Sequence, residues 1–319
     1  MRVLIVTNMW PTPARPAFGS FVRDQVTAIR ALAEPGLEVE VEVLPAGSYA
    51  GAARALRAAT RQTAFDVVHA HYGLTLWPAL VVPTRFRAVT LHGTDVRDRR
   101  AGLLTRAALP FADLVASVSA DLARELPPAR GRQRRAVLPC GVAVDRFFPQ
   151  PRDAARRRNG LDPAGTYLLF PADPARAGKR ADRARELAAA TGATLLTAGN
   201  VDPAEMPWLV NAANAVVVPS DAEGFGLAAL EALACDIPVL ATPTGNHPET
   251  LANIGGALCA PFDLSAWAAA LAPHLTGSDS RIAGRERALQ YGAAPLGRNV
   301  VRAWRQLAGE PLDSPGAAS

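Results

Sequence analysis

Two glutamates eight positions apart stand in the stretch VVVPSDAEGFGLAALEALACDIPVLA, residues 216–241. Glu223 lies in an acidic loop, and Glu231 lies on the helix that the following run of strong helix formers predicts. At the rise of an α-helix, the two carboxylates are about 10–12 Å apart along the axis. That is about the span from the sugar to the ribose of a nucleotide-sugar, so the pair could bind both ends of such a ligand.

A strand–turn–helix unit must hold these glutamates. Residues 216–219 and 238–241 are apolar runs, too short for helices and rich in β-branched residues, which predicts two buried strands. Gly224 and Gly226 predict a tight turn into the helix. Such a unit is typical of an α/β domain.

The start of this helix could bind an anion. The backbone amides around Phe225, Gly226 and Leu227 are the unpaired donors of a helix N-terminus, where the dipole favours a group such as a diphosphate. The alternative is structural. Glu223 would then be a loop charge that is favourable near the helix end, and Glu231 a solvated helix residue.

Lys179 is the only lysine among 34 basic residues. It lies in the loop PADPARAGKRADRA, after an expected buried strand at 166–170 and beside the start of a helix. A lysine ammonium is a compact point charge for which phosphate is a common ligand. The alternative is an ordinary surface lysine.

Three of the five histidines follow or end two predicted parallel strands, in DVVHAHYG and TLHGTDV. Ligands in open α/β sheets gather outside the carboxyl ends of strands, so His92 with Asp95 is the better candidate for substrate contact. His69 is expected in the core, and His71 lies nearer the strand end. No Cys or Glu stands at ligand spacing around them, so no metal site is expected.

The first strand is expected at 2–7, followed by a Pro-rich loop and a helix at 21–32. Gly19 stands at the start of that helix, where backbone amides can face a ligand. The alternative is a plain helix cap. No G-x-G-x-x-G follows the strand, which counts against a dinucleotide oxidoreductase.

The segment EGFGLAALEALACDIPVLAT resembles the E-x7-E signature of retaining glycosyltransferases of the GT-B fold, in particular family 4. The resemblance implies that Glu223 lies at the transferred sugar and that Glu231 binds the ribose of the nucleotide. Gly224 to Leu227 would then contact the donor through the turn.

Two first-half segments resemble the same family. FGSFVRDQV resembles its glycine-bearing first loop, which implies that the backbone at Gly19 approaches donor or acceptor. TLHGTDV resembles a segment whose histidine, here His92, contacts the donor sugar and helps define the acceptor pocket. On this resemblance His71 and Asp95 lie on the acceptor side.

The loop that holds Lys179 resembles the family's G-R-x-x-x-x-K-G segment, whose Arg and Lys neutralise the donor diphosphate. The lysine matches, but Pro174 stands where the arginine is usual, so Arg176 and Arg180 are the candidates to replace it. Gly199 ends the next expected strand and would let a nucleotide base approach.

Strands and helices alternate in both halves, which predicts an α/β protein of two Rossmann-like doubly wound parallel sheets, and the resemblance implies the GT-B arrangement with the two domains facing a cleft. We expect an acceptor-side domain at 1–150 and a nucleotide-sugar-binding domain at 151–294. A helix at 295–308 is expected to rejoin the first domain, and 309–319 to form a flexible tail.

Composition and charge argue against several other classes of protein. The net charge of +5 comes from scattered arginines with local clusters at 130–135 and 156–158, without a nucleic-acid motif, so we expect solvated or membrane-surface faces and no nucleic-acid partner. Three distant cysteines predict neither disulfides nor a metal site. The N-terminus reads as a strand and no apolar stretch suits a membrane span. We expect a cytoplasmic protein and leave peripheral contact with the inner face of a membrane open.

These observations predict a retaining glycosyltransferase that moves a hexose-type sugar to a hydroxyl acceptor, which is a sugar, a lipid-linked glycan or a small molecule. The donor is a nucleotide-sugar, with a UDP-sugar as the first choice and GDP-mannose as the second. The expected catalytic set is Glu223, His92 and Lys179. Because the sequence has no Asp-x-Asp, no metal or other cofactor is expected. The alternatives are a non-catalytic nucleotide-sugar-binding protein of this fold, or another enzyme on it such as an epimerase or a phosphorylase.

Overall fold

The computed structural model describes residues 1–45, 48–199, 201–276 and 279–310. Most of the expected tail, 311–319, lies outside the described residues. The chain forms two compact units: unit 1 is Met1–Cys140 with Ala293–Ser319, and unit 2 is Gly141–Gly292. The boundary expected near residue 150 therefore falls inside unit 2.

Unit 1 is built on a parallel sheet in the order β2-β1-β3-β4-β5-β6. The expected apolar runs form its centre, and the alternating EVEVEV forms the edge strand β2, because only one of its faces packs on the core. The strands are β1 (Arg2–Thr7), β2 (Glu38–Val43), β3 (Phe65–His71), β4 (Thr84–Leu91), β5 (Leu114–Ser117) and β6 (Arg134–Val137).

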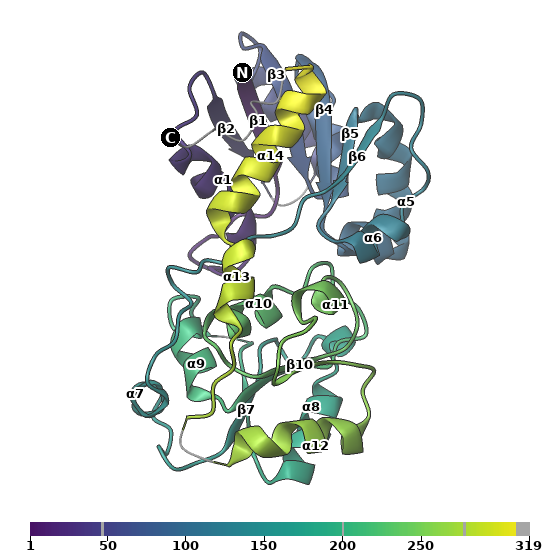
Figure 1. The fold of residues 1–319 in the computed structure, drawn as a ribbon. Coiled ribbons are helices and arrows are strands. Elements are labelled where there is room, and N and C mark those ends of the chain that lie inside the picture. Colours follow the sequence, from purple (N-terminus) through teal and green to yellow (C-terminus); the bar gives the residue numbers. More distant parts are fainter. Residues whose placement is uncertain (46–47, 200, 277–278, 311–319) are drawn as a thin grey trace. The chain divides into compact units, whose positions relative to one another are not determined.

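Helices cover this sheet (Figure 1). The longest described one, at the end of the chain, packs against the first helix and buries Val300, Trp304 and Leu307 in the core of unit 1. The helical elements are α1 (Ser20–Ala31), α2 (Tyr49–Ala59), η1 (Gly73–Thr75), α3 (Leu76–Ala79), α4 (Thr94–Arg97), α5 (Arg99–Ala108), η2 (Leu109–Phe111), α6 (Ala120–Arg124) and α14 (Ala293–Ala308).

Unit 2 repeats the plan with a parallel sheet in the order β11-β10-β9-β7-β8. Its strands are β7 (Tyr167–Phe170), β8 (Thr194–Thr197), β9 (Ala215–Val218), β10 (Val239–Ala241) and β11 (Ala257–Cys259). Its helical elements are α7 (Arg152–Arg158), η3 (Ala177–Lys179), α8 (Ala181–Thr191), α9 (Met206–Ala212), α10 (Leu227–Ala234), α11 (His247–Thr250), α12 (Leu264–Leu275) and α13 (Arg285–Gln290).

Each sheet has a point at which the strand order reverses, between β1 and β3 in unit 1 and between β7 and β9 in unit 2. Ligands of doubly wound sheets bind at such switch points, outside the carboxyl ends of the strands. The loops after β1, β7 and β9 carry Gly19, Lys179 and Glu223, and β3 ends at His71. His92 and Asp95 follow the neighbouring strand β4, and Gly199 follows β8. Topology alone therefore identifies one candidate binding region in each unit.

The basic cluster at 156–158 is solvated only in part: Arg157 and Arg158 are exposed, as expected, whereas for Arg156 the expectation was wrong. Arg156 is only 4% exposed and donates to the carbonyl of Ala212 and to Oδ1 of Asn214. Arg157 and Arg158 each form an ion pair with an acidic neighbour. One charge of the run is thus used inside unit 2, and the other two stay on its surface.

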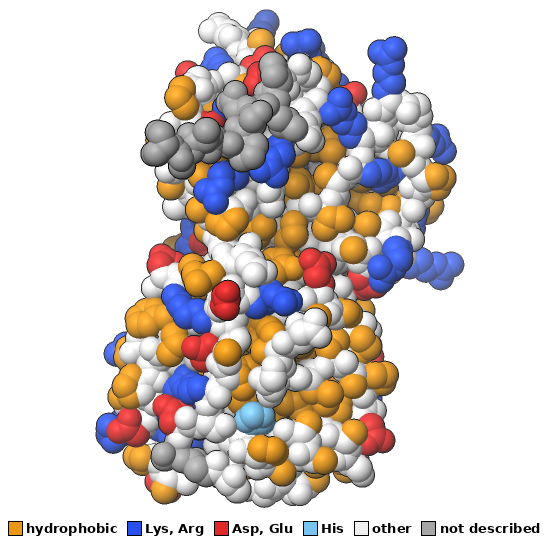
Figure 2. All heavy atoms as spheres, in the orientation of Figure 1, with side chains coloured by type: hydrophobic (Ala, Val, Ile, Leu, Met, Phe, Trp, Pro, Cys, Tyr) orange, Lys and Arg blue, Asp and Glu red, His pale blue; other side chains and the backbone are white. Residues whose placement is uncertain are grey.

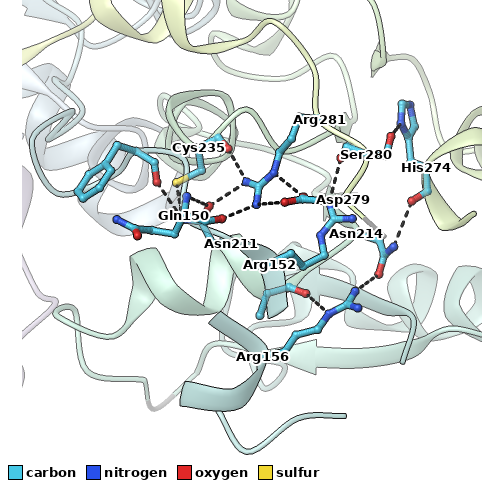
Figure 3. A network of polar contacts seen from close by, with 12 residues as sticks. Gln150, Arg152, Arg156, Asn211, Asn214, Cys235, His274, Asp279, Ser280 and Arg281 are labelled. Carbon is cyan, nitrogen blue, oxygen red and sulfur yellow. Dashed lines mark hydrogen bonds and ion pairs between the residues drawn. The ribbon is translucent and has the colours of Figure 1, made fainter. Parts of the chain in front are cut away.

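Arg281 is the centre of a neighbouring part of this polar network (Figure 3). Its guanidinium donates to Asn211 Oδ1 at 2.8 Å, to the Cys235 carbonyl at 2.8 Å and to the Gln150 carbonyl at 2.6 Å. The planar fork of an arginine suits several fixed acceptors at once. One side chain thereby joins three segments of unit 2 that are distant in sequence.

Candidate active site

Lys179 and Glu223 form an ion pair at the switch point of unit 2. Lys179 ends η3, after β7, and its Nζ lies 2.6 and 2.7 Å from the two carboxylate oxygens of Glu223, in the loop after β9. Ser220 Oγ donates to the same carboxylate at 2.7 Å. The two residues that the sequence proposed separately are thus brought into direct contact.

Glu223 is ionised although it is only 8% exposed. Burial by itself raises the pKa of this carboxyl, but the charge of Lys179 and the hydrogen bonds from Lys179 and Ser220 outweigh burial and hold the pKa below its usual value. A buried carboxylate of this kind accepts hydrogen bonds strongly. It could accept them from sugar hydroxyl groups.

The turn between Glu223 and α10 depends on Gly226. Its φ of 98° lies in the left-handed region, and a Cβ there would stand 2.2 Å from Nε2 of His247. Gly226 is the N-cap of α10, and no side chain in the described part of the chain caps this helix end. The first-turn amides, beginning at Leu227, therefore point to where an anion could bind.

The other residues of the E-x7-E stretch have different surroundings. Phe225 is buried against Tyr291, with ring centroids 6.2 Å apart, so only its backbone could serve a ligand. Gly224 lies in the loop and Glu231, half-buried, on α10. The helix begins only at Leu227, so the helical rise covers only part of the spacing between the two glutamates.

A loop that the sequence reading missed lies against this turn. His247 is fully buried, and its Nδ1 donates to the Thr242 carbonyl at 2.9 Å because a carbonyl can only accept. Burial lowers the pKa of His247, so the ring is neutral and its Nε2 is an acceptor. The His247 Nε2, Asn246 Nδ2 and Thr244 Oγ1 atoms are buried without a hydrogen-bond partner in the described part of the chain. Such atoms commonly receive a water or a ligand.

Asn246 is the N-cap residue of α11 and Glu249 follows at the spacing of a capping box, but that motif does not form in the described residues. The Asn246 side chain makes no capping hydrogen bond, and its backbone amide donates to the Phe225 carbonyl instead. The Glu249 carboxylate accepts from the Tyr291 hydroxyl at 2.8 Å. These tertiary partners occupy the Asn246 amide and the Glu249 carboxylate, the two groups that a capping box would pair with each other.

The structure separates the two arginine candidates beside Lys179. Arg180 is bound to Asp182 and to Asp221, with nitrogen–oxygen distances of 2.6 and 3.1 Å, and these contacts raise the pKa of its guanidinium. Arg176 is exposed at the start of η3 and forms no ion pair within the described residues. Gly199 is exposed after β8, and a Cβ there would crowd Asp173 at 3.1–3.3 Å.

In unit 1 the three histidines form a stack that reaches α14. Trp304 Nε1 donates to His69 Nδ1 at 2.9 Å, which leaves His69 Nε2 to donate to Thr90 Oγ1 at 2.8 Å. The His71 ring stacks on both neighbouring histidines, and its Nδ1 lies 3.2 Å from His92 Nε2. His69 is buried, as expected, and the contact from Trp304 was not foreseen.

Burial keeps these rings neutral. It lowers the pKa of His71 to about 4, and it lowers the pKa of His92 well below the usual value, with the neighbouring His71 adding to the effect. His71 Nε2 is buried without a partner among the described residues. A neutral imidazole can donate or accept a hydrogen bond at neutral pH without carrying charge.

Asp95 and Gly19 hold the backbone around this stack. Asp95 is completely buried and its carboxylate accepts from the amides of His92, Gly93 and Gly73 at 2.8–3.1 Å. This gives Asp95 a positioning role for the His92 loop. At Gly19, with φ 73°, a Cβ would stand 2.2 Å from the carbonyl carbon of Met9, so only glycine lets the loop approach so closely.

The described ranges lack a metal-binding cluster and a membrane-spanning helix. They contain no group of three or more His, Cys, Asp or Glu side chains placed to hold a metal ion. No helix in them has the length and apolar character needed to cross a membrane.

Comparison with known proteins agrees with this architecture. The family described as Glycosyltransferase Family 4 matches residues 2–146, and the family described as Glycosyl transferases group 1 matches residues 167–291. The chain belongs to the group 1 glycosyltransferases of family 4, and it is a glycosyltransferase. The family that the motifs resemble is thus confirmed.

Relatives known by sequence are similar over most of the chain. A D-inositol 3-phosphate glycosyltransferase of Frankia alni is 30% identical over 366 residues, covering 94% of this chain and 88% of the relative. One of Geodermatophilus obscurus is 31% identical over 306 residues, covering 77% and 68%.

Solved structures show the same fold. Sucrose-phosphate synthase of Thermosynechococcus elongatus has a TM-score of 0.75 at 21% identity and covers 97% of this chain and 100% of its own. Anabaena HepE in complex with UDP and glucose has a TM-score of 0.71 at 15% identity, covering 96% and 100%. The GT-B fold class is confirmed.

Proposed function

We propose that this glycosyltransferase is a retaining enzyme that moves a hexose-type sugar from a nucleotide-sugar to a hydroxyl acceptor. A UDP-sugar is the first choice of donor and GDP-mannose the second. The contact between Lys179 and Glu223 beside the uncapped start of α10 carries the proposal. It puts a cation, a carboxylate and free amides together at one switch point.

Each group has a role that its surroundings support. Lys179 and the amides of the turn bind the diphosphate, and Arg176 adds a second positive charge because no carboxylate neutralises it in the described chain. Glu223 accepts hydrogen bonds from the transferred sugar. Glu231 accepts them from the ribose, and Gly199 leaves room for the base.

The reaction exchanges one bond to the sugar for another. The bond from the anomeric carbon to the diphosphate oxygen breaks and the nucleoside diphosphate leaves with its electron pair. The acceptor oxygen attacks the same carbon from the same face, and its proton passes to the departing diphosphate. The positive groups of unit 2 stabilise the charge that develops on the leaving group, so the proposal includes no metal ion.

The histidine stack of unit 1 supports contact with uncharged hydroxyl groups. His92 is half-buried and neutral, so it can hydrogen-bond a sugar hydroxyl, and His71 holds its ring in place. Because the named relatives act on D-inositol 3-phosphate, an inositol phosphate is the first acceptor to test. UDP was bound in the solved HepE structure, which makes UDP the first nucleotide.

The proposal is tested by calorimetry and thermal shift with UDP, GDP, dTDP and ADP, each with Mg²⁺ and with EDTA. One nucleotide should bind more tightly than the other three, and its affinity should be the same with Mg²⁺ and with EDTA. At a hundred times its dissociation constant it should add about 2.7 kcal/mol of stability. The corresponding nucleotide-sugars are then tested with inositol phosphates and other hydroxyl acceptors, and the anomeric configuration of the product is read by NMR.

Variants separate binding from turnover. Glu231→Ala should weaken nucleotide binding, whereas Glu223→Gln should bind the nucleotide and lose turnover. Arg180→Gln is the matched control for Arg176→Gln, because Arg180 is already neutralised by carboxylates. Inverted product would refute retention, and affinity that requires Mg²⁺ would refute the metal-free site.

A further inference from the structure

Helix α5 buries small residues and exposes large apolar ones. Leu103 is 69% exposed and Leu104 is 50% exposed. The residues that the helix buries are Ala101, Gly102, Thr105 and Ala108. A helix that only had to pack on unit 1 would bury its leucines, because burial of large apolar side chains drives helix packing. The arrangement of α5 therefore leaves an apolar face turned to the surroundings.

Two aromatic residues extend this face. Trp77 donates through Nε1 to the Leu104 carbonyl at 3.2 Å, and its ring lies 6.1 Å from that of Phe111, centroid to centroid. Phe111 is 53% exposed. Half of the large apolar side chains that are exposed in the described residues thus gather here. A cluster of exposed apolar side chains marks an interaction site more often than single, scattered apolar side chains do.

Arginines border the apolar side chains. Arg99, Arg100 and Arg106 are exposed and make no ion pair within the described ranges, whereas Arg97 nearby is bound to Glu125 at 2.6 Å. The first two stand at the N-terminal end of α5, where the helix dipole disfavours positive charge. Unit 1 itself therefore gains nothing from Arg99 and Arg100, which indicates a negatively charged partner, whereas Arg106 in the last turn of α5 is also favourable for the helix.

A shallow pocket of about 530 Å³ lies in the same surface. It is lined by Val96, Arg97, Asp98, Arg99, Leu103, Arg106 and Glu125. Glu125 is paired with Arg97 and Asp98 caps α5, so Arg99 and Arg106 are the lining charges without an ion pair in the described residues, beside apolar walls. Figure 2 shows blue and orange side chains next to one another over α5 and α6. A partner that fits must be both anionic and apolar. Lipid phosphates above acyl chains meet that description.

We propose that this surface, the α5 patch (Trp77, Leu103, Leu104, Phe111, Arg99, Arg100 and Arg106), binds a bilayer that contains anionic phospholipids. The leucines and aromatic rings enter the boundary between headgroups and acyl chains, and the arginines contact lipid phosphates. A second copy of the chain fits less well, because a two-fold contact would bring like charges together. The inference does not depend on the sugar donor or on the acceptor.

Flotation of the full chain with vesicles tests the proposal. The protein should float with equimolar phosphatidylcholine and phosphatidylglycerol, and not with phosphatidylcholine alone. Leu103→Asp with Leu104→Asp should abolish flotation. Arg99→Gln and Arg100→Gln should each weaken the partition roughly fivefold at low salt, from a contribution of about 1 kcal/mol per basic residue near the surface.

Leu289→Asp is the matched control, because Leu289 is a comparably exposed leucine, 47%, in unit 2. It should float like the wild type. Circular dichroism and nucleotide-induced thermal shift show that each variant is folded. Equal binding to neutral vesicles, no binding to anionic ones, or unchanged binding of the double aspartate variant would overturn the proposal. So would a wild-type dimer that the double variant converts to monomer.

Discussion

At the scale of single residues, the site depends on groups whose charge is fixed by a partner. Glu223 is ionised because Lys179 and Ser220 outweigh its burial. The same contact occupies the Lys179 ammonium, so a diphosphate bound there, as proposed, would share it with the Glu223 carboxylate. Loss of one member of such a pair therefore affects the other as well as the ligand.

We expect Lys179→Met to lower the free energy of unfolding by about 2–3 kcal/mol, because it leaves Glu223 buried without its main counter-charge. The double variant Lys179→Met with Glu223→Gln should recover most of this loss, since no charge then remains buried. Urea denaturation at neutral pH measures both. Additive losses in the double variant would show that the pair is not coupled.

The histidine stack predicts a pH dependence. The pKa of His71 is about 4 in the folded chain and about 6.5 when the chain is unfolded, so the unfolded state binds more protons between these values. Stability is therefore full above pH 6.5 and falls as the pH drops towards 4. The protonation of His71 alone lowers the free energy of unfolding by at most about 3 kcal/mol.

The variant His71→Asn should lose less stability over this range than the wild type does. Urea unfolding at pH 7.5 and pH 5 gives the comparison, with Asp95 left intact because it holds the adjacent loop. If the stability of the variant depends on pH as strongly as that of the wild type, His71 is not a source of the effect.

At the scale of elements, glycine turns set how closely the loops approach. Gly226 joins β9 and its acidic loop to α10, and the 244–247 loop packs on the same turn. The approach leaves no room for a side chain. The turn and the neighbouring loop with its buried polar atoms are therefore packed together and should move together.

Gly226→Ala should destabilise unit 2 by about 1–3 kcal/mol from backbone strain alone, and the contact with His247 adds to it. Nucleotide affinity should fall too, because the amides of α10 shift. Gly255→Ala is the control: no atom lies within 4 Å of a Cβ there, so thermal unfolding should be almost unchanged. Equal melting temperatures for the two variants would contradict the account.

At the scale of the whole molecule, the two units differ in how the chain builds them. Unit 2 is one continuous segment, whereas unit 1 needs α14 from the end of the chain. Helix α14 buries apolar side chains in the core of unit 1, and these include Val300, Val301, Trp304 and Leu307. At about 1.5–3 kcal/mol each, these burials approach the stability of a typical domain.

A fragment of residues 141–292 should therefore fold alone and show a nucleotide-dependent melting temperature. A chain that ends at 292 should keep that transition and lose the cooperative unfolding of unit 1. Calorimetry of both fragments beside the full chain measures this. The account fails if the shortened chain shows both transitions unchanged.

Much of the fold could be predicted because local signals agree. Short β-branched runs predicted central strands of the sheets. The edge strand EVEVEV and the Ser119 cap of α6 also have local causes, an alternating pattern and a serine before a helix. The resemblance to the family singled out Glu223 and Lys179, and the structure places these two side chains in contact. The local rules failed where tertiary partners compete, as at Asn246 and Arg156.

By itself, the sequence determined the element order, the parallel sheets, the family and the residue types of the site, because each depends on periodicity or spacing along the chain. Only the tertiary structure decided which groups meet: Lys179 with Glu223, Trp304 with His69, and His247 with Gly226. It also decided which arginines are neutralised and which leucines stay exposed. Contacts between residues distant in sequence depend on how the sheets and helices pack, and no local pattern records that packing.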